Sequence, residues 1–497
     1  RFRCSYLQGD AAVSRSDADD GARFTIDVAP VAGSEPIKVT ADNVLMCTGS
    51  FATRMGSIPF DGRRIFDADS INGLGFLPES VAIVGSGIIA IEYAKIFRKL
   101  GAEVTMLVRS NAMSALTRIG LDYTIAERLL QSLADDDVKV LEYTQIKEFV
   151  ETDVDSEGCS IYGGDCEALT IALESKDGED KGTINPEIFL AATGRKPRTS
   201  MEWVGGAGVE KGERGHIEVD GSFQTSTKGI FAAGDCIAGP GLASTGVDQA
   251  QRAVGAMFEQ QSYRASEHFP IGMWTIPEIG YYGLTKKAAI EKGIDAEEGI
   301  ATYDACLRGR VFAPDGMLKL VFCKDTAKIV GVHIIGTDAC ELVHYGMDLV
   351  DKETTIFDVI STLFTAVTFH ELFKEAALNA NEKLEFGIQW QELLNDLSST
   401  APTLDLSPED LRGRFDEIDT SGDGSLDEEE LLTVFTNMGH EVTESAIAQL
   451  MHIADEDGNG TLEWDEFFAL FQMLQKLAQK QEKESAAEEL SPELTTV

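Results

Sequence analysis

The chain lacks closely spaced cysteines, long apolar runs and an apolar signal segment at its start. Its eight cysteines form no CxxC or CxxxxC pair and no zinc-ligand spacing. This pattern is typical of a reduced, cytoplasmic protein and gives no sign of a disulfide framework. The most apolar stretch, 81–91, is too short to span a bilayer and continues into Glu92 and Lys95, so no membrane segment is predicted.

Basic residues are scarce as well. The formal net charge is −42, and the segment from Asp405 to the C-terminus carries 24 acidic but only 5 basic side chains. Nucleic acid is therefore not an expected partner, because no basic stripe is available to neutralise phosphates. The acidic C-terminal part instead favours calcium or a basic partner.

A glycine loop between a predicted strand and a predicted helix is the first positive signal. In "VAIVGSGIIAIE" an apolar strand runs into Gly85-x-Gly87-x-x-Ala90 and then a helix, and a second strand, "EVTMLVR", follows. The first glycine allows a tight turn, the second lets the backbone approach a pyrophosphate, and the alanine lets the helix pack on the strand. The helix N-terminus offers free N–H groups to the phosphates. We interpret the pattern as a dinucleotide site; a glycine-rich turn in another βαβ unit is the alternative.

The end of the second strand bears on the choice between NAD and NADP. A site that prefers NAD usually has a carboxylate there, which binds the ribose 2′-hydroxyl. This chain has Val108 followed by Arg109. Because a guanidinium attracts a 2′-phosphate, NADP(H) is predicted to bind, with NAD(H) also admitted. A solvated surface arginine is the alternative.

Several segments, in their order along the chain, resemble the flavin-dependent pyridine nucleotide-disulfide oxidoreductases. They are the glycine loop, "AATGRKP", "TKGIFAAGD", "WTIPEIGYYGLT", "KIVGVHIIGTDACELVHYG" and "AALNANEKL". The likeness covers residues 1 to about 385 and, within the family, is greatest to the soluble transhydrogenases. It implies Rossmann-like α/β domains that bind FAD and NAD(P), and an α+β interface domain that forms a homodimer.

The resemblance also implies roles for individual residues. Asp235 is expected to accept a hydrogen bond from the ribityl chain of FAD, with turn capping as the alternative. A helix that begins near Ala243 and Ser244 would aim its N-terminus at flavin O2 and N1. Glu92, one turn along the nucleotide helix, matches the family's glutamate beside the nicotinamide, and Gly194 is predicted to contact a cofactor.

One departure from the family pattern distinguishes among its members. Disulfide reductases carry a catalytic histidine in an "HPT..E" segment, where it exchanges protons with a thiol pair. Anchored on "KEAALN", this chain has Ala366 and Val367 at the His and Pro positions, and Glu371, the candidate catalytic acid, at the acidic position. Alanine cannot transfer a proton, and we interpret His370 as a packing or surface residue. The pattern favours hydride transfer between NADPH and NAD⁺ via FAD; a dihydrolipoamide dehydrogenase-like reductase is the alternative enzyme.

The same resemblance predicts an incomplete flavin site. The family's FAD-binding GxGxxG precedes the part that residues 1–50 resemble, so about a hundred residues are expected before Arg1 in the complete protein. This chain alone is therefore expected to bind FAD poorly and to be inactive.

Two segments fit the twelve-residue calcium loop of EF-hands, with oxygen ligands at positions 1, 3, 5, 7, 9 and 12 and a turn-forming glycine at position 6. The predicted ligands are Asp419, Ser421, Asp423, the Ser425 carbonyl, Asp427 and Glu430 in "DTSGDGSLDEEE", and Asp455, Asp457, Asn459, the Thr461 carbonyl, Glu463 and Glu466 in "DEDGNGTLEWDE". Leu426 and Leu462 are expected to meet in a short strand between the loops.

Calcium could regulate the protein or only stabilise the pair. A calcium-responsive interaction protein with an inert flavoprotein portion is therefore a further alternative.

Together these signals predict an α/β protein with an α+β dimerisation domain and an all-α EF-hand pair. The predicted segments are the remainder of the FAD-binding domain (1–78), the NAD(P)-binding domain (79–197), the return segment of the FAD-binding domain (198–264), the dimerisation domain (265–387), a linker (388–409), the EF-hand pair (410–478) and a disordered acidic tail (479–497).

Overall fold

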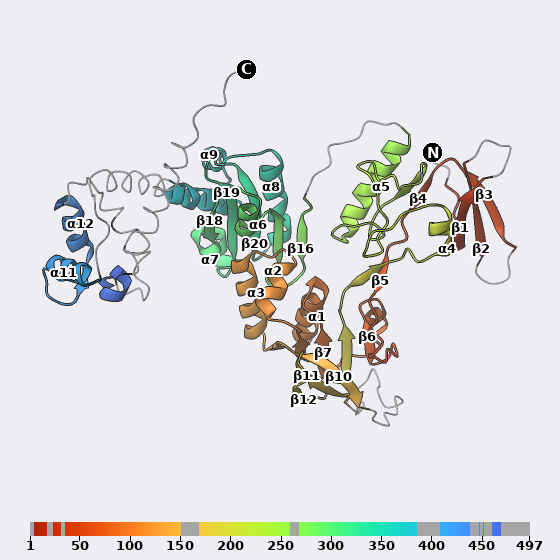
Figure 1. Cartoon of the computed structure of the whole chain (residues 1–497), viewed down its shortest axis with the longest axis horizontal. Helices are drawn as coiled ribbons and strands as arrows, with labels where there is room; N and C mark the ends of the chain where they lie inside the picture. The colour runs from red at the N-terminus through yellow and green to blue at the C-terminus, as the bar shows by residue number, and fades with distance from the viewer. Residues whose placement is uncertain are drawn as a thin grey trace, which may run out of the picture. The chain divides into compact units, whose positions relative to one another are not determined.

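The computed structural model describes residues 4–16, 23–30, 35–150, 168–258, 268–384, 408–437, 447, 451 and 460–468. The chain divides into two compact units, Arg1–Ala377 and Leu378–Val497, whose elements are labelled in Figure 1. Among the described residues, no helix combines the length and the apolar character that crossing a membrane requires. Most of the predicted linker and all of the predicted tail lie outside the described residues.

The first unit opens with a small antiparallel sheet, as the alternation of apolar and polar residues predicts. Its strands β1 (Gly9–Arg15), β2 (Phe24–Pro30) and β3 (Ile37–Ala41) pair in chain order. The next strand, β4 (Val44–Met46), pairs in parallel with β15 (Ile230–Ala232), which carries "GIFAAGD". This pairing brings the segment after β4 beside the turn that contains Asp235.

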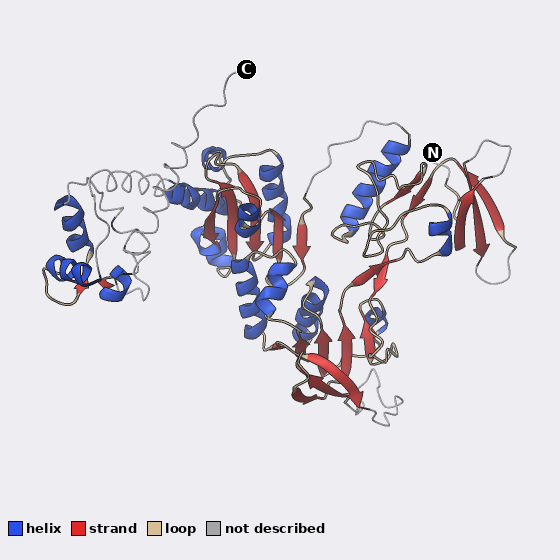
Figure 2. Cartoon of the chain, in the orientation of Figure 1, coloured by secondary structure: helices blue, strands red, loops and turns tan. Residues whose placement is uncertain are grey.

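A five-stranded parallel sheet, in the order β6-β13-β7-β8-β9, forms the core of the domain that the sequence predicts to bind NAD(P), called the nucleotide-binding domain below. Its strands are β6 (Ile65–Asp67), β7 (Ser80–Val84), β8 (Glu103–Leu107), β9 (Lys139–Leu141) and β13 (Ile188–Ala191). The helices α1 (Ile88–Lys99), α2 (Ala112–Arg118) and α3 (Tyr123–Asp135) cover one face. The antiparallel strands β10 (Gln145–Val150), β11 (Thr170–Glu174) and β12 (Asp180–Ile184) cover the other, as Figure 2 shows. Because both faces are buried, the parallel strands are continuously apolar.

Strand β6 lies outside the segment 79–197 that the sequence predicts for this domain. Nevertheless, β6 pairs in parallel with β13, and its Phe66 belongs to the same core as α1. The sheet therefore extends back to Ile65. A strand of three residues is too short to show a periodic pattern, which is why the sequence does not reveal it.

The carboxylate of Asp67 fixes the end of β6. It accepts hydrogen bonds from Ser70 N (2.7 Å), Asp69 N (3.0 Å) and Arg54 Nε (2.6 Å). Burial alone would raise the pKa of Asp67, but these donors outweigh it and lower the pKa to about 2. Because the folded pKa is depressed, the stabilisation is present above the pKa of the unfolded carboxyl and is lost as the pH falls toward 2.

Replacing this carboxylate should therefore cost stability in a pH-dependent way. We expect Asp67→Asn to lower the free energy of unfolding by about 2 kcal/mol at pH 7 and by much less near pH 2. Urea denaturation at the two pH values measures the difference. Equal losses at both would show that the carboxylate charge contributes nothing.

Short elements connect the nucleotide-binding and flavin segments. Strand β14 (Arg195–Pro197), which follows the "AATG" turn, pairs antiparallel with β5 (Ser50–Ala52). The return segment then contains α4 (Glu202–Gly206), β15 and α5 (Ala243–Met257). Helix α5 begins at the residue where the sequence places it.

The interface domain is the predicted α+β unit. Its antiparallel sheet, in the order β16-β17-β20-β19-β18, consists of β16 (Ile271–Met273), β17 (Ile279–Gly283), β18 (Ala296–Thr302), β19 (Met317–Cys323) and β20 (Ile329–Ile335). Its helices are α6 (Lys286–Glu291), α7 (Leu307–Phe312), α8 (Ala339–Asp351), α9 (Ile356–Ser361) and a helix that begins at residue 371. Met317 and Ile335 share one apolar core with Leu116 and Ile125 of the nucleotide-binding domain, so these two domains are packed together.

The second unit contains the EF-hand region. Its described elements are α11 (Pro408–Ile418), β21 (Ser425–Leu426), α12 (Glu428–Asn437) and β22 (Leu462–Glu463). The two short strands pair antiparallel with Leu426 opposite Leu462, which confirms the predicted link between the loops. Both leucines belong to a core with Phe415, Ile447 and Met451.

Candidate dinucleotide and calcium sites

The glycine loop after β7 has the geometry that a phosphate site needs. Gly85 has φ +136°, and a Cβ atom there would lie 2.3 Å from the carbonyl oxygen of Ala192. At Gly87, by contrast, an added Cβ atom would meet nothing within 4 Å, so the backbone is open to a ligand. Ala90 is fully buried against the strand. The three small residues thus serve the turn, the ligand approach and the helix packing, in that order.

Helices α1 and α5 begin without a side-chain cap. Neither Gly87, before α1, nor Leu242, before α5, places a side-chain acceptor on the first N–H groups. Helices α2, α3 and α6 are capped by Asn111, Asp122 and Thr285, whereas α4 and α8 also lack a side-chain cap. The free N–H groups of an uncapped helix attract an anion. The two helices that the sequence assigns to cofactors are therefore equipped to receive one.

Glu92 lies on α1, one turn beyond the glycine loop. Its Oε1 atom accepts a hydrogen bond of 2.9 Å from the backbone N–H of Trp274, which follows β16 of the interface domain. Burial raises the pKa of Glu92 above its ordinary value. Trp274 is 67% exposed as a residue. The sequence identifies Glu92 but not this partner, because a backbone donor leaves no residue-type signal in the motif "WTIPEIG".

Asp235 lies in a polar cluster formed by distant segments. Its Oδ2 atom accepts a hydrogen bond of 2.6 Å from Ser50 Oγ and lies 3.9 Å from Arg195 Nε. The same Arg195 donates to Ser50 Oγ (2.7 Å) and pairs with Asp69 (2.6 Å). The sequence does not predict a role for Ser50 or Arg195; the arginine of the "ATGR" motif is the signal that could have indicated it.

The turns on either side of this cluster are built on glycines. Gly194 has φ +103°, and its carbonyl accepts a hydrogen bond of 2.9 Å from Thr53 N. Gly234 has φ +76°, and its N–H donates to Gln249 Oε1 of α5 (2.8 Å). Helix α5 therefore packs directly on the turn that precedes Asp235, and Ala243 and Ser244 are exposed at its N-terminus.

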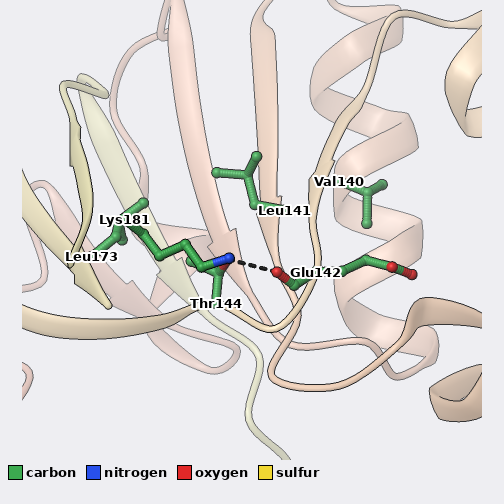
Figure 3. A pocket seen from close by; sticks show the side chains of 6 residues that line it. All are labelled: Val140, Leu141, Glu142, Thr144, Leu173 and Lys181. Atoms are coloured by element: carbon green, nitrogen blue, oxygen red, sulfur yellow. Dashed lines mark hydrogen bonds between the residues drawn. The ribbon is translucent and has the colours of Figure 1, made fainter. Parts of the chain in front are cut away.

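Arg109 extends from the end of β8 as an exposed side chain, and Val108 before it is buried. The backbone of Val108 is hydrogen-bonded to the end of β9 and to the segment after it: its N–H donates to Leu141 O (2.9 Å), and its carbonyl accepts from Thr144 N (3.0 Å). A cavity of about 360 Å³ opens beside this segment (Figure 3), and it is lined by Val140, Leu141, Glu142, Thr144, Leu173 and Lys181. The strand end that carries Arg109 therefore adjoins a cavity with both apolar and polar walls.

The segment that replaces "HPT..E" is largely exposed. Val367 has φ +63°, and the carboxylate of Glu371 accepts a hydrogen bond of 3.1 Å from Thr368 N at the start of the following helix. His370 is an exposed residue whose ring packs beside Tyr345 and Phe373, with centroid distances of 5.7 and 6.0 Å. The structure thus gives Glu371 a helix-capping contact and supports the interpretation of His370 as a packing residue.

The first EF-hand loop is folded around its own carboxylates. Asp419 accepts hydrogen bonds from Gly422 N (2.6 Å), Gly424 N (2.8 Å) and Ser421 Oγ (3.0 Å). Glu430, 9% exposed, accepts from Ser421 N (2.9 Å). The turn glycine Gly424 has φ +89°. Within the described residues, no three carboxylate, imidazole or thiol groups converge as a formed metal centre.

The remaining loop ligands are described in part. Asp427 and Glu430 bond reciprocally, Asp427 N to Glu430 Oε2 (3.1 Å) and Glu430 N to Asp427 Oδ1 (2.8 Å), and so begin α12. Asp423 Oδ1 accepts from Ser425 N (2.9 Å). In the second loop, Thr461, Glu463 and Glu466 are described, and Glu466 accepts from Glu463 N (3.0 Å). The predicted ligands Asp455, Asp457 and Asn459 lie outside the described residues.

Taken together, the fold and the site define a class: oxidoreductases that combine a dinucleotide-binding sheet with a second nucleotide half-site and an interface domain. Residues 8–255 match the family Pyridine nucleotide-disulphide oxidoreductase, 269–377 match its dimerisation domain, and 408–472 match the EF-hand domain pair. The chain belongs to the pyridine nucleotide-disulphide oxidoreductase family and carries a C-terminal EF-hand region. FAD and nicotinamide nucleotide use are implied by the family, and the dimerisation domain supports a homodimer.

Individual relatives fit this assignment. The chain is 33% identical over 361 residues to a soluble pyridine nucleotide transhydrogenase of Mycobacterium tuberculosis (strain ATCC 25177 / H37Ra), with 72% of each chain covered. It is 31% identical over 351 residues to that of Ectopseudomonas mendocina (strain ymp), with 70% of this chain and 71% of the relative covered. In fold it is similar to the crystal structure of LpdA from M. tuberculosis, with a TM-score of 0.63, 22% identity, and 75% of this chain and 76% of that one covered.

Proposed function

We propose that the complete protein transfers hydride between NADPH and NAD⁺ through FAD, and that its EF-hand pair binds calcium. The observation that carries the first part is Ala366, which stands where disulfide reductases have their proton-transferring histidine. An alanine cannot exchange a proton with a thiol pair, whereas hydride transfer between nicotinamides does not need that exchange. The soluble transhydrogenases among the relatives support the same assignment.

The residues present fit the two nucleotides. The open backbone at Gly87 and the uncapped start of α1 would hold the pyrophosphate of a nicotinamide nucleotide. The uncapped start of α5 and the Asp235 cluster would hold FAD, α5 by the positive end of its dipole and Asp235 by accepting a hydrogen bond. FAD supplies, when bound, the group that takes hydride from one nicotinamide and returns it to another.

Glu92 has the position of an orienting group in this scheme. Its carboxylate is fixed by Trp274 N, and its half-buried environment favours a strong hydrogen bond to an amide donor. We assign it the role of holding the nicotinamide carboxamide. Glu371 is proposed to be a catalytic acid that lies at the interface between the two subunits of the homodimer.

The proposed reaction has a direct test. The complete protein, purified with FAD, should oxidise NADPH when NAD⁺ or its thionicotinamide analogue is the only acceptor, and the absorbance of the reduced analogue should rise in step. Turnover of lipoamide without nicotinamide exchange would instead support the dihydrolipoamide dehydrogenase-like alternative. A colourless protein without either activity would contradict both.

Arg109 should distinguish the two nicotinamide nucleotides. We expect Arg109→Ala to weaken NADPH binding about tenfold or more, because a charge-assisted contact to the 2′-phosphate is lost, and to leave NADH binding nearly unchanged. Isothermal titration calorimetry with each nucleotide measures both affinities. Arg118→Ala, which removes an exposed arginine of the same domain, is the control. Equal losses for NADPH and NADH would show that Arg109 does not contact the 2′-phosphate.

The calcium proposal rests on the ligand set of the loops. The first loop supplies four carboxylates, and Gly424 and Gly460 both have the positive φ that the sharp turn requires. The pairing of Leu426 with Leu462 couples the two loops. When calcium binds, the ion would take the place of the N–H groups that now donate hydrogen bonds to Asp419 and Glu430.

A further inference from the structure

A buried cation lies between the nucleotide-binding domain and the interface domain. The Nζ atom of Lys319, on β19, is 2.8 Å from Asp122 Oδ1 and 2.8 Å from Thr124 Oγ1, both of the nucleotide-binding domain. On its own sheet it is 3.1 Å from Glu298 Oε2. The lysine side chain is 1% exposed. A buried ammonium is stable only when its partners satisfy it, so these contacts fix Asp122 and Thr124 relative to the sheet.

Lys319, His333 and Tyr281 form a row across three adjacent strands of the interface sheet. Lys319 is opposite His333 on β20, and His333 is opposite Tyr281 on β17. The hydroxyl of Tyr281 donates to the carbonyl of Ile119, at the end of α2 (3.3 Å). Burial lowers the pKa of His333, which favours its neutral form, so Lys319 is the cation of this row. Lys319 and Tyr281 thereby connect the interface sheet to α3 and to the end of α2, and β20 itself contacts α3. Figure 1 labels these elements.

Helix α3 links this row to α1. Asp122 caps α3 by accepting a hydrogen bond of 3.1 Å from Thr124 N. Near the other end of α3, Lys95 of α1 donates to Ser132 O (2.8 Å) and to Asp136 Oδ2 (2.8 Å). Lys95 is three residues from Glu92 on α1, so it joins α3 to the part of α1 that carries Glu92.

We infer that Lys319 is a positioning residue: by anchoring α3 to the interface sheet, it holds Glu92 against the backbone N–H of Trp274. The lysine is not among the residues assigned to either nucleotide, and it acts through α3 and α1. The kinetic consequence rests on the proposed function, because Glu92 orients the nicotinamide only if hydride transfer occurs here. The docking of the two domains does not depend on it and is measured separately.

The docking is tested by hydrogen exchange on the full chain. Lys319→Met keeps the length of the side chain and removes its charge. We expect amides in 112–128 and 268–276 to exchange about tenfold faster in this variant, since the anchored contact opens more often. Lys324→Met is the control, because Lys324 is 41% exposed and pairs only with the exposed Asp295 (2.9 Å) among the described residues. Unchanged exchange in folded Lys319→Met would overturn the inference.

The kinetic test separates positioning from stability. In the complete protein with FAD, Lys319→Met should lower kcat about tenfold, with KM for NADPH and flavin content within about twofold, and Lys319→Arg should restore most of the rate. A lower melting temperature with normal kcat would reduce Lys319 to a structural role. If Lys319→Met does not fold, Asp122→Asn, which keeps the cap acceptor, decides by the same measurements. Absence of hydride transfer in the unmodified protein would contradict the proposed function and leave the exchange result standing.

Discussion

Gly85→Ala should unfold the nucleotide-binding domain. The residue has φ +136°, where an L side chain is strained, and its added Cβ would lie 2.3 Å from the carbonyl oxygen of Ala192. That oxygen is a backbone atom of the first residue of the "ATG" turn, directly after β13, so it cannot move aside as a flexible side chain could. We expect the free energy of unfolding to fall by more than about 3 kcal/mol, measured by urea denaturation with circular dichroism.

Gly87→Ala is the matched control, because it makes the same chemical change two residues away. Gly87 has φ −83° and nothing within 4 Å of the added carbon, so stability should change by less than about 1 kcal/mol. The methyl group would instead occupy the space into which the pyrophosphate fits. NADPH and NADH should both bind at least about tenfold more weakly. A stable Gly85→Ala variant, or a Gly87→Ala variant with normal nucleotide affinity, would refute this division of roles.

Local patterns in the sequence predicted much of the fold. The strand-loop-helix unit, the start of α5 and the pairing of Leu426 with Leu462 depend on contacts between residues close in sequence or within a defined motif. In such stretches a periodic apolar pattern or a turn glycine has one main structural meaning. At these three places, the predicted elements agree with the described structure.

Long-range partners could not be predicted in the same way. The contact between Glu92 and Trp274 N uses a backbone donor, and Ser50 meets Asp235 only because β4 pairs with β15. In the sequence, Lys319 within "LKLVF" cannot be distinguished from an ordinary charged strand residue, although in the structure it is buried against another domain. Each case depends on which segments meet in three dimensions, and a single sequence does not contain that information.

The same limit applies to Glu371. The family pattern suggests a catalytic acid, whereas the structure shows its carboxylate bound to Thr368 N at a helix start. A capping carboxylate and a catalytic one need the same residue type, so the motif alone cannot separate them. The exposed position of Val367, with φ +63°, places this turn where a second subunit could reach it.

Glu430→Gln should remove calcium binding from the first EF-hand loop. The residue supplies the bidentate ligand at position 12, and its replacement removes one charge and one of the two ligating oxygens. Glu430 is 9% exposed as a residue, and its carboxylate accepts hydrogen bonds from Ser421 N and Asp427 N, so it already faces the loop interior. We expect calcium affinity at this loop to fall about a hundredfold or more, measured by isothermal titration calorimetry on the full chain.

Glu429→Gln supplies the control for this prediction. Glu429 precedes Glu430 in the first turn of α12 and is exposed, so the substitution makes the same change in charge outside the ligand set. Its calcium affinity should stay within about twofold, since a solvated charge at this distance is largely screened. Equal weakening by both variants would mean that the acidic surface attracts the ion without a defined loop ligand. No calcium heat in the unmodified chain at millimolar calcium would contradict the proposed site altogether.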